Sequence, residues 1–337
     1  MELIGQPTFP SPGYRRTLGL QNLQSFMFSF LRRLKLSYAA YNVFQRRRLA
    51  HNLPIYQKLG LQKRYFSPIS SRDFAGLPAN AGLPTVPALA QRLAANPAFR
   101  ALPAANQASL QAFEENGFAL LPQFFSDKAV ENINNELQQL VASRQVSVRY
   151  VNKFMFAFRK SARIRAAGEG ALREVVGALL GHEATLFQSI NFLSGSQQRT
   201  HSDSIHMSTF PLGGMAAAWV ALEDITPDNG PLHYYPGSHK LPYYFNADYQ
   251  NEGSSWLIGN KDYAEYERFI AGRVAELGLQ KQVFLARKGD VFIWHANLMH
   301  GGEPHLDAAQ TRKSMVFHYF SRAHICYHEI TQRPALL

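Results

Sequence analysis

The sequence has little of what a secreted or membrane-spanning protein needs. Its 337 residues include a single cysteine, Cys326, which excludes an internal disulfide and a cysteine-paired zinc site. A lone thiol is typical of a reducing compartment. No apolar run reaches the roughly 18 residues of a membrane-spanning helix, and the first residues, MELIGQPTFPSPGYRR, do not have the pattern of a secretory signal. These absences predict a cytoplasmic protein.

Acidic residues are scarce at the start of the chain. The first 75 residues contain twelve Lys or Arg and only two acids, Glu2 and Asp73, whereas the remainder is nearly neutral. The formal net charge of +11 therefore belongs almost entirely to an N-terminal arm. No nucleic-acid-binding motif accompanies this charge, so we expect no nucleic-acid partner.

Residues 20–50 have the pattern of a basic amphipathic helix. Apolar side chains recur at helical spacing, and a run of three arginines follows them. The apolar positions are Leu23, Phe26, Met27, Phe30, Leu31, Leu34, Tyr38 and Tyr41. Such a helix can pack on the body of the protein with a solvated basic face. It can also lie on an anionic membrane surface with its apolar side down, which would make the protein peripheral at the membrane.

Composition divides the chain into three parts. Residues 1–66 form the basic arm with its amphipathic helix. Residues 67–106 are rich in Pro and Ala and predict a connector, because repeated prolines interrupt regular structure, with a short helix near 88–95. The folded domain is expected over 107–330. Within it, 241–279 is rich in aromatic residues and separates core strands, which favours a lid-like insertion over a pocket.

The folded domain is expected to begin with helices and to continue as strands. Ser126 resembles the N-cap of a helix that ends near residue 143, 149–158 is strand-like, and 170–180 is helical. After His182, short β-rich runs alternate with Gly, Pro and Asn turns, which is typical of an antiparallel sandwich or barrel. These runs are ATLFQSINFL, MAAAWVALE, PLHYYP, QVFLAR, DVFIWHA and KSMVFHYFS.

Two potential metal ligands, His201 and Asp203, stand two residues apart in the segment THSDS. On a strand, residues at this spacing point to one face about 6–7 Å apart, so an imidazole and a carboxylate can converge on one ion. His300, in LMHGG after the apolar run DVFIWHA, is a candidate third ligand. Two histidines and one carboxylate are the ligand set of non-haem Fe(II) oxygenases, which leaves other coordination positions open.

The same spacing can also arise without a metal site. A histidine two residues before an acid arises by chance in a chain with 12 histidines and 24 acids, and polar turn residues produce the same pattern. For the position of third ligand, His295, His305 and His318 compete with His300 on composition alone. The pattern by itself therefore leaves the ligand set open.

Arg312 and Ser314 add a second feature. Arg312 follows His300 by twelve residues and stands with Ser314 in TRKSMVFHYF. Because the two residues are two positions apart, both side chains are expected on one face of that strand. The planar guanidinium of Arg binds a carboxylate with two hydrogen bonds, and a neighbouring hydroxyl adds a donor. Such a socket suits the distal carboxylate of 2-oxoglutarate, whose keto-acid end chelates iron. An exposed arginine on a surface strand would give the same pattern.

The stretch from about residue 107 to 325 resembles the phytanoyl-CoA dioxygenase family, which includes ectoine hydroxylase. The motifs that carry this resemblance, in order, are NGFALLPQFFS, THSD, WVALEDITPDNGPLHYYPGSHK, GDVFIWHANLMHGG and RKSMVFHYF. The resemblance implies a β-rich α+β protein built on a double-stranded β-helix, a jelly-roll or cupin-like barrel, flanked by N-terminal helices. It implies Fe(II) as cofactor, 2-oxoglutarate as co-substrate and O₂ as oxidant.

The resemblance also assigns site residues. It implies that His201, Asp203 and His300 hold the metal and that Arg312 anchors 2-oxoglutarate, with no catalytic residue beyond the ligands. Because Gly302 stands where the family often has serine, Ser314 is expected to make the hydroxyl contact alone. The further residues that the match places in the 2-oxoglutarate pocket are Trp219, Gln188 and Lys153. From the residues alone, the tryptophan is a core residue and the lysine a solvated one.

The implied reaction is hydroxylation of a small or lipid-like substrate at an unactivated carbon, with release of succinate and CO₂. Asp203 argues against a halogenase, in which a small residue replaces the carboxylate. Two other classes remain open. One is a non-redox metal-binding β-barrel protein, against which Arg312 and Ser314 argue. The other is a peripheral-membrane interaction protein, against which the complete ligand set argues.

Overall fold

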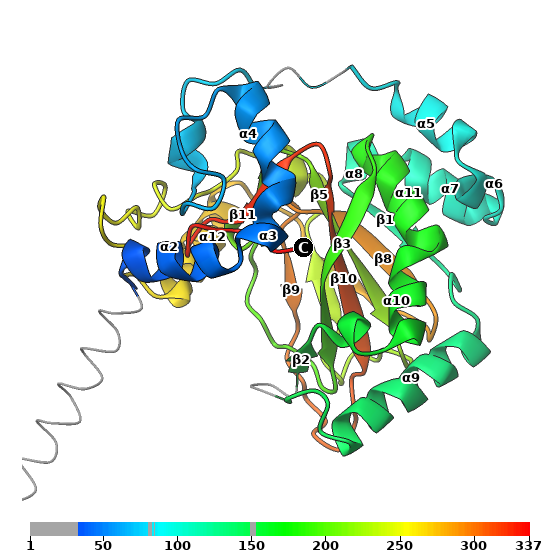
Figure 1. Ribbon diagram of the computed structural model, residues 1–337. Coiled ribbons are helices and arrows are strands. Elements are labelled where there is room, and N and C mark those ends of the chain that lie inside the picture. The colour runs from blue at the N-terminus through cyan, green and yellow to red at the C-terminus, as the bar shows by residue number, and fades with distance from the viewer. Residues whose placement is uncertain (1–32, 80–82, 84, 149–152) are drawn as a thin grey trace, which may run out of the picture.

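The computed structural model describes residues 33–79, 83, 85–148 and 153–337 (Figure 1). Its central element is a six-stranded antiparallel sheet in the order β1-β8-β5-β10-β3-β2. Two three-stranded sheets, β12-β11-β4 and β7-β6-β9, complete the barrel. The strands are β1 (Phe118–Leu121), β2 (Lys153–Met155), β3 (Ala184–Phe192), β4 (Ser208–Phe210), β5 (Met215–Ala221), β6 (Leu232–Tyr234), β7 (Gln282–Phe284), β8 (Val291–His295), β9 (His300–Gly302), β10 (Ser314–Ser321), β11 (Ile325–His328) and β12 (Arg333–Pro334).

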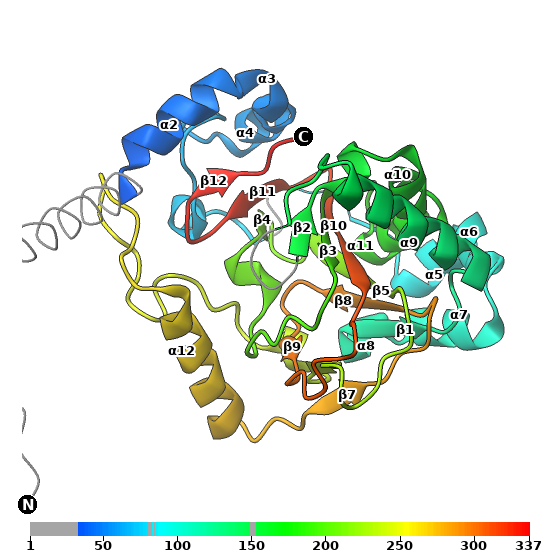
Figure 2. The ribbon, with the colours of Figure 1, turned by 90° about the horizontal axis from the view of Figure 1, so that it is seen from below.

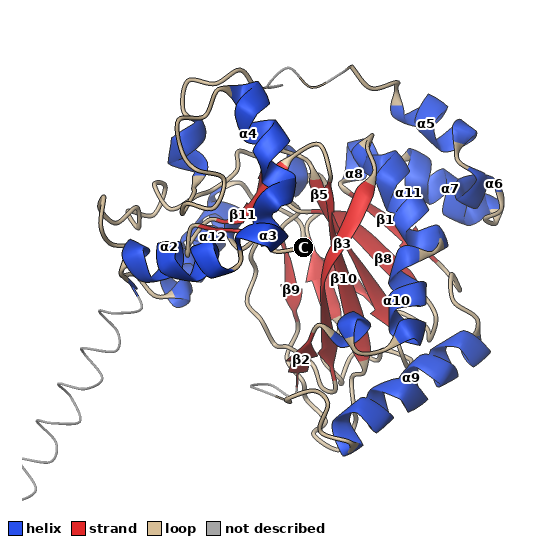
Figure 3. Cartoon of the chain, viewed as in Figure 1, coloured by secondary structure: helices blue, strands red, loops and turns tan. Residues whose placement is uncertain are grey.

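Helices cover the outer side of the large sheet and the region beside β11 and β12 (Figure 3). Their bounds are α2 (Lys35–Phe44), α3 (Arg46–Leu49), α4 (Leu53–Leu59), α5 (Leu89–Ala95), α6 (Pro97–Arg100), α7 (Ala104–Gln111), α8 (Phe113–Asn116), α9 (Asp127–Ala142), α10 (Ala162–Glu169), α11 (Ala171–Leu180) and α12 (Tyr263–Glu276). Figure 2 shows α12 on the opposite side of the sheets from α9, α10 and α11. Within the described ranges, no helix is long and apolar enough to cross a membrane.

Alternation along β5 explains how the large sheet serves two cores. Ala216, Ala218 and Val220 belong to the cluster shared with α10 and α11, whereas Trp219 and Ala221 belong to the cluster inside the barrel. Successive side chains of a strand point to opposite faces. A strand buried on both faces therefore reads as a continuous apolar run, as MAAAWVA does. The six β-rich runs of the sequence all form strands, as expected.

The helices of the folded domain also begin where the sequence predicts. Ser126 caps α9 by accepting a hydrogen bond from the backbone N–H of Ala129 at 3.3 Å. Gly170 precedes α11, which ends at Leu180. The expected strand over 149–158 is shorter, since β2 ends at Met155 and Phe156 adopts a left-handed backbone that starts a 3-10 turn. Residues 149–152 lie outside the described ranges.

The Pro/Ala-rich connector is more helical than its prolines suggest. It contains the expected short helix, α5, but also α6 and the start of α7. Pro97 is the first residue of α6 and Pro103 directly precedes α7. At these positions proline has no backbone hydrogen bond to lose, so it starts a helix and does not break one. Leu93 and Phe99 are buried in the core shared with α11.

The amphipathic helix expected over 20–50 lies partly outside the described residues, since 1–32 are not included. In the described part it is interrupted at Gln45, between α2 and α3. The backbone of Leu34 pairs with that of Leu257 in an isolated antiparallel bridge. The most exposed apolar residues of α2 are instead Leu36, at 71%, and Phe44, at 85%. The face that α2 presents to solvent therefore differs from the expected apolar stripe.

Candidate metal and 2-oxoglutarate site

Three potential metal ligands meet inside the barrel. His201 and His300 form an isolated antiparallel bridge with reciprocal backbone hydrogen bonds of 2.9 Å. Asp203 follows two residues later and begins a 3-10 turn. Its Oδ1 lies 3.7 Å from His201 Nε2 and 3.8 Å from His300 Nε2. Among the described residues, this is the group of three ligand atoms that lie within 4.8 Å of one another.

The local backbone differs from the expectation of a continuous strand through His201 and Asp203. Only His201 is in a β-bridge, and the chain turns at Asp203, where the backbone N–H groups of His206 and Met207 donate to its carbonyl at 2.9 and 2.8 Å. The carboxylate still faces the histidines because the Trp294 indole N–H donates to Asp203 Oδ2 at 2.8 Å. This bond leaves Oδ1 directed toward both imidazoles.

Both histidines present a lone pair to the centre of the group. His201 Nδ1 lies 2.9 Å from the carbonyl oxygen of Arg199, and His300 Nδ1 lies 2.9 Å from that of Leu298. Because a carbonyl only accepts, each Nδ1 carries the proton and each Nε2 is an acceptor. Burial lowers the pKa of His300 to about 4, so its ring is neutral at pH 7.

The donor set fits a divalent metal. Two imidazole nitrogens and one carboxylate oxygen face one another with no proton donor between them, an arrangement that is repulsive unless a cation lies at the centre. Although burial opposes ionisation of Asp203, its pKa lies well below the usual value, and the Trp294 N–H donates to the ionised carboxylate. An ionised carboxylate is the form that binds metal.

The competing histidines lie in different places. His295 is next to the rings of His239 and Tyr243, away from the group. His305 accepts a hydrogen bond from the backbone N–H of Gly195 at 3.2 Å. His318 is close, with Nε2 3.7 Å from Asp203 Oδ2, the oxygen on the side away from His201 and His300. The geometry thus favours His300 as third ligand and makes His318 a neighbour of the site.

We expect Trp294→Phe to weaken iron binding about 10- to 100-fold, because groups that orient a metal ligand typically contribute that much. The substitution removes the N–H that aims the Asp203 carboxylate but keeps an aromatic ring in the core. Anaerobic titration with Fe(II) measures the effect, and Trp256→Phe, at a tryptophan that is 75% exposed, is the matched control. Equal iron affinity in both variants would show that the indole does not position the carboxylate.

A cavity of about 80 Å³ adjoins the three ligands, and Arg312 also lines it. Arg312 is 3% exposed. Its Nε donates to the Gly230 carbonyl at 3.1 Å, its Nη1 donates to Ser314 Oγ at 2.8 Å, and its guanidinium carbon lies 5.0 Å from the centre of the Trp219 ring. Arg312 lies two residues before the start of β10, whereas the sequence suggested that it lies on the strand with Ser314.

The buried positive charge of Arg312 favours binding of an anion beside it. No carboxylate in the described part of the chain lies within ion-pair distance of it. Burial lowers the pKa of Arg312 to about 10, which still leaves the guanidinium charged at pH 7. A buried charge without a partner is costly, so a carboxylate in the cavity would be bound strongly. The residues therefore fit the distal carboxylate of 2-oxoglutarate.

The other residues expected in the 2-oxoglutarate pocket separate into two groups. Trp219 lines the inner cavity with Arg312 and the three potential ligands. Gln188 and Lys153 instead line an adjoining outer cavity of about 680 Å³. Residues of this outer cavity that the sequence patterns did not single out are Met155, Phe156, Ile190, Ser196, Gln198, His206, Met207, Met215, Tyr263, Glu267, His328 and Arg333. No local motif marks them, since they come from strands, loops and α12 far apart in the chain.

Comparison with known proteins agrees with this geometry. Residues 113–314 match the family described as phytanoyl-CoA dioxygenase. The ectoine dioxygenase of Sphingopyxis alaskensis is 29% identical over 210 residues, which cover 56% of this chain and 68% of that protein. Phytanoyl-CoA dioxygenase domain-containing protein 1 of Danio rerio is 44% identical over 45 residues, 13% of this chain and 16% of that protein.

Two solved structures resemble the whole barrel. The non-heme alpha-ketoglutarate-dependent carbocyclase SnoK from nogalamycin biosynthesis has a TM-score of 0.53 at 16% identity, covering 71% of this chain and 88% of its own. The epimerase SnoN of the same biosynthesis has a TM-score of 0.51 at 20% identity, covering 68% and 87%. At these identities the likeness concerns the fold, and it confirms the expected double-stranded β-helix.

Proposed function

The chain belongs to the phytanoyl-CoA dioxygenase family of Fe(II)- and 2-oxoglutarate-dependent oxygenases, and we propose that it hydroxylates a small or lipid-like substrate at an unactivated carbon. In the balanced reaction, 2-oxoglutarate, O₂ and R–H give succinate, CO₂ and R–OH. One oxygen atom of O₂ enters succinate and the other enters the product. The iron supplies the oxidising chemistry when bound, and the protein supplies binding and orientation.

The observation that carries the proposal is the position of Arg312 in the same small cavity as His201, Asp203 and His300. In the proposed site, the two histidines and the aspartate hold Fe(II). Arg312, with the hydroxyl of Ser314, binds the distal carboxylate of 2-oxoglutarate. A metal site and an anion socket in one cavity match the two ends of this co-substrate.

The remaining residues have roles in orientation and in excluding water. Trp219 forms an apolar wall beside the guanidinium of Arg312, where it strengthens the charge interaction by keeping water away. Gln188 and Lys153 line the outer cavity, and we assign them to the substrate side of the site. Trp294 holds the carboxylate of Asp203 in its metal-facing orientation. A metal held by these residues would lie beside the outer cavity, since His201 and Asp203 line that cavity as well.

Anaerobic reconstitution with Fe(II) and 2-oxoglutarate, followed by exposure to ¹⁸O₂, tests the function. Candidate substrates are screened for stimulation of succinate formation, and products are analysed by mass spectrometry. Hydroxylation predicts one ¹⁸O atom in succinate and one in the product. Iron binding without succinate would favour a non-redox metal-binding barrel. An oxidised product without ¹⁸O would contradict hydroxylation and indicate a different oxidation of the substrate.

We further propose that residues 241–279 cover the outer cavity and contribute to substrate choice. Tyr263, the first residue of α12, lines this cavity, and its hydroxyl accepts a hydrogen bond from Gln198 Nε2 at 3.2 Å. Tyr266 and Ile270 on the same helix are fully buried. The segment is therefore part of the packed structure, and point substitutions test it better than a deletion would.

Tyr263→Ala is expected to raise the ratio of 2-oxoglutarate consumed to product formed about tenfold, because poor closure lets oxidation proceed without a positioned substrate. The ratio is measured as succinate against product. Tyr263→Phe keeps the ring and loses only the hydrogen bond to Gln198, so it serves as the matched variant. If Tyr263→Ala and the unmodified protein gave the same ratio, α12 would not act as a cover of the outer cavity.

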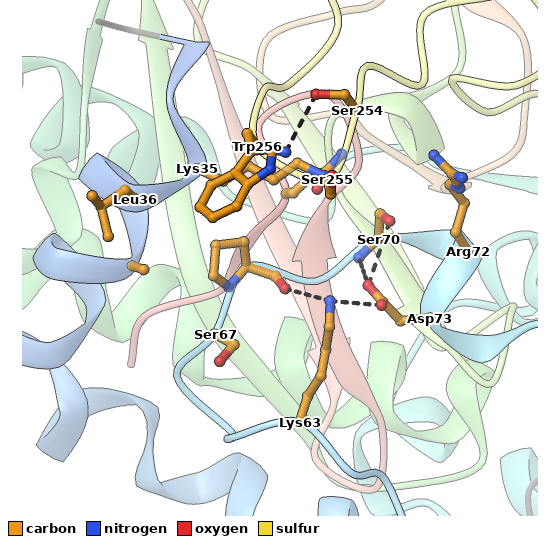
Figure 4. A pocket seen from close by; sticks show the side chains of 13 residues that line it. Lys35, Leu36, Lys63, Ser67, Ser70, Arg72, Asp73, Ser254, Ser255 and Trp256 are labelled. Carbon is orange, nitrogen blue, oxygen red and sulfur yellow. Dashed lines mark hydrogen bonds and ion pairs between the residues drawn. The ribbon is translucent and has the colours of Figure 1, made fainter.

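Membrane attachment through residues 20–50 is a subsidiary proposal, and one surface feature favours it. Leu36 and Trp256, both more than 70% exposed, border a pocket that is also lined by Lys35, Arg72 and the ion pair of Lys63 with Asp73 (Figure 4). Exposed apolar groups beside cations suit an anionic membrane surface. Co-sedimentation with anionic and neutral vesicles at two salt concentrations tests it, and equal binding to both kinds of vesicle would contradict it.

A further inference from the structure

His318 is a further histidine beside the three potential metal ligands. It stands on β10, is 6% exposed, and lines both the inner cavity, with Arg312, and the outer cavity. Its Nε2 lies 3.7 Å from Asp203 Oδ2, the carboxylate oxygen to which the Trp294 indole donates at 2.8 Å. Of the two ring nitrogens of His318, Nε2 is therefore the one directed toward the site.

The surroundings of the two ring nitrogens decide which of them carries the proton. Nδ1 of His318 is buried and has no hydrogen-bond partner among the described residues. A proton on Nδ1 would be a buried donor without an acceptor, whereas a proton on Nε2 points toward the carboxylate of Asp203. In His201 and His300, by contrast, a backbone carbonyl holds the proton on Nδ1. His318 thus presents an N–H to the site, where the two ligand histidines present lone pairs.

The Nε2–H of His318 has no acceptor at hydrogen-bond distance in the described part of the chain. Asp203 Oδ2, at 3.7 Å, lies beyond the roughly 3.2 Å of an N–H···O bond, and it already accepts from Trp294. A donor left without a partner in a buried place costs stability, and such groups are rare unless they have a function. Because His318 lines the cavity, its N–H is available to a molecule bound there.

The inner face of β10 connects His318 to the anion socket. Ser314, Val316 and His318 are spaced by two residues, so their side chains point to one face of the strand. Val316 lines the same inner cavity, and Ser314 accepts the hydrogen bond from Arg312 Nη1. A co-substrate whose distal carboxylate is bound by Arg312 therefore extends along this face toward the metal ligands. Its keto-acid end would then lie beside His318.

An irregularity in the sheet occurs at the same position. The pairing of β10 with β3 shifts by one residue directly after His318, which leaves Phe187 of β3 without a partner on β10. Such a bulge changes the direction of the side chains around it and is common next to active sites. Here the ring of Phe187 lies 6.3 Å from that of His318, centre to centre. The imidazole is thus buried beside an aromatic ring with its Nε2 toward Asp203.

We propose that His318 binds and orients the co-substrate by donating its Nε2–H to the keto-acid carboxylate of 2-oxoglutarate, at the end opposite to Arg312. This inference rests on the proposed function, whose co-substrate it concerns. Arg312 holds only the distal carboxylate, so it does not by itself fix the rotation of the keto-acid end beside the metal. A second, charge-assisted hydrogen bond at that end would fix it.

Anaerobic titration of 2-oxoglutarate into the Fe(II)-loaded protein, followed by the visible band of the complex, tests the proposal. His318→Leu removes the N–H and should weaken binding of 2-oxoglutarate about tenfold or more, because hydrogen bonds to charged groups are the stronger ones. It should also displace the band, since the keto-acid end is then oriented differently. The affinity for Fe(II) is measured separately, without 2-oxoglutarate, and should be retained.

Two conservative variants separate the hydrogen bond from the packing of the ring. His318→Gln places an amide N–H near the position of Nε2, so it should restore most of the affinity and the band. His318→Asn has a shorter side chain, whose amide reaches only the position of Nδ1, so it should behave like His318→Leu. The matched control is His295→Leu, at a histidine that lies beside His239 and away from the ligands, and it should leave 2-oxoglutarate binding unchanged.

Several results would overturn the proposal. One is the same 2-oxoglutarate affinity and band in His318→Leu as in the unmodified protein. Another is loss of Fe(II) from His318→Leu, which would make His318 part of the metal site. If thermal unfolding shows that His318→Leu does not fold, equal behaviour of His318→Gln and His318→Asn would overturn it instead. Failure of the proposed function is distinct, since the unmodified iron-loaded protein would then bind no 2-oxoglutarate.

Discussion

His300→Ala is expected to abolish tight iron binding and, with it, all turnover of 2-oxoglutarate. His300 Nε2 and His201 Nε2 are the two imidazole nitrogens that face Asp203 Oδ1, so removal of His300 leaves a two-residue site. The loss should exceed the roughly 10- to 100-fold typical of groups that merely orient a ligand. The weak visible band that Fe(II) and 2-oxoglutarate give together under anaerobic conditions is the measurement.

Two other histidines provide controls for this substitution. His295 is half-buried at the end of β8 and lies beside His239, so His295→Ala should keep the band. His318→Ala tests the histidine on the other side of Asp203. If His318→Ala lost the band while His300→Ala retained it, the ligand set proposed above would be wrong. Thermal unfolding of all three variants separates loss of metal from loss of structure.

Arg312→Ala should raise the KM for 2-oxoglutarate about 30-fold or more while Fe(II) still binds. Removing one partner of a buried charge pair costs about 2–5 kcal/mol, and about 2 kcal/mol corresponds to roughly 30-fold in affinity. The effect is large because Arg312 has no competing carboxylate in the described part of the chain and is almost fully buried. Steady-state succinate formation at varied 2-oxoglutarate measures it.

Ser314→Ala is a milder change at the same anion socket. Ser314 Oγ accepts a hydrogen bond from Arg312 Nη1 at 2.8 Å, so its removal loosens the guanidinium without removing the charge. One neutral hydrogen-bonding group contributes about 1 kcal/mol, which predicts less than a tenfold rise in KM. An unchanged KM in Arg312→Ala, or a larger effect in Ser314→Ala, would show that the co-substrate is anchored elsewhere.

Local patterns were sufficient for the six β-rich runs and for the helices that begin at caps. Ser126 starts α9 because its hydroxyl oxygen satisfies a backbone N–H that the helix cannot, and this depends on neighbours in sequence alone. The same is true of the β-rich runs, whose apolar content reflects burial on one or both faces. Patterns failed where backbone geometry had alternatives, as at Pro97 and Pro103, which start helices in a stretch expected to be irregular.

The sequence alone identified two candidate pairs, His201 with Asp203 as metal ligands and Arg312 with Ser314 as the anion socket. It could do so because the members of each pair are two residues apart. His201 and Asp203 converge although the backbone turns between them, and Arg312 contacts Ser314 although it precedes the strand. Composition left His295, His300, His305 and His318 open and the family resemblance implied His300, but only the tertiary structure gives the physical reason for that choice. That choice depends on which strand pairs with the bridge at His201, and cross-strand register is a long-range property.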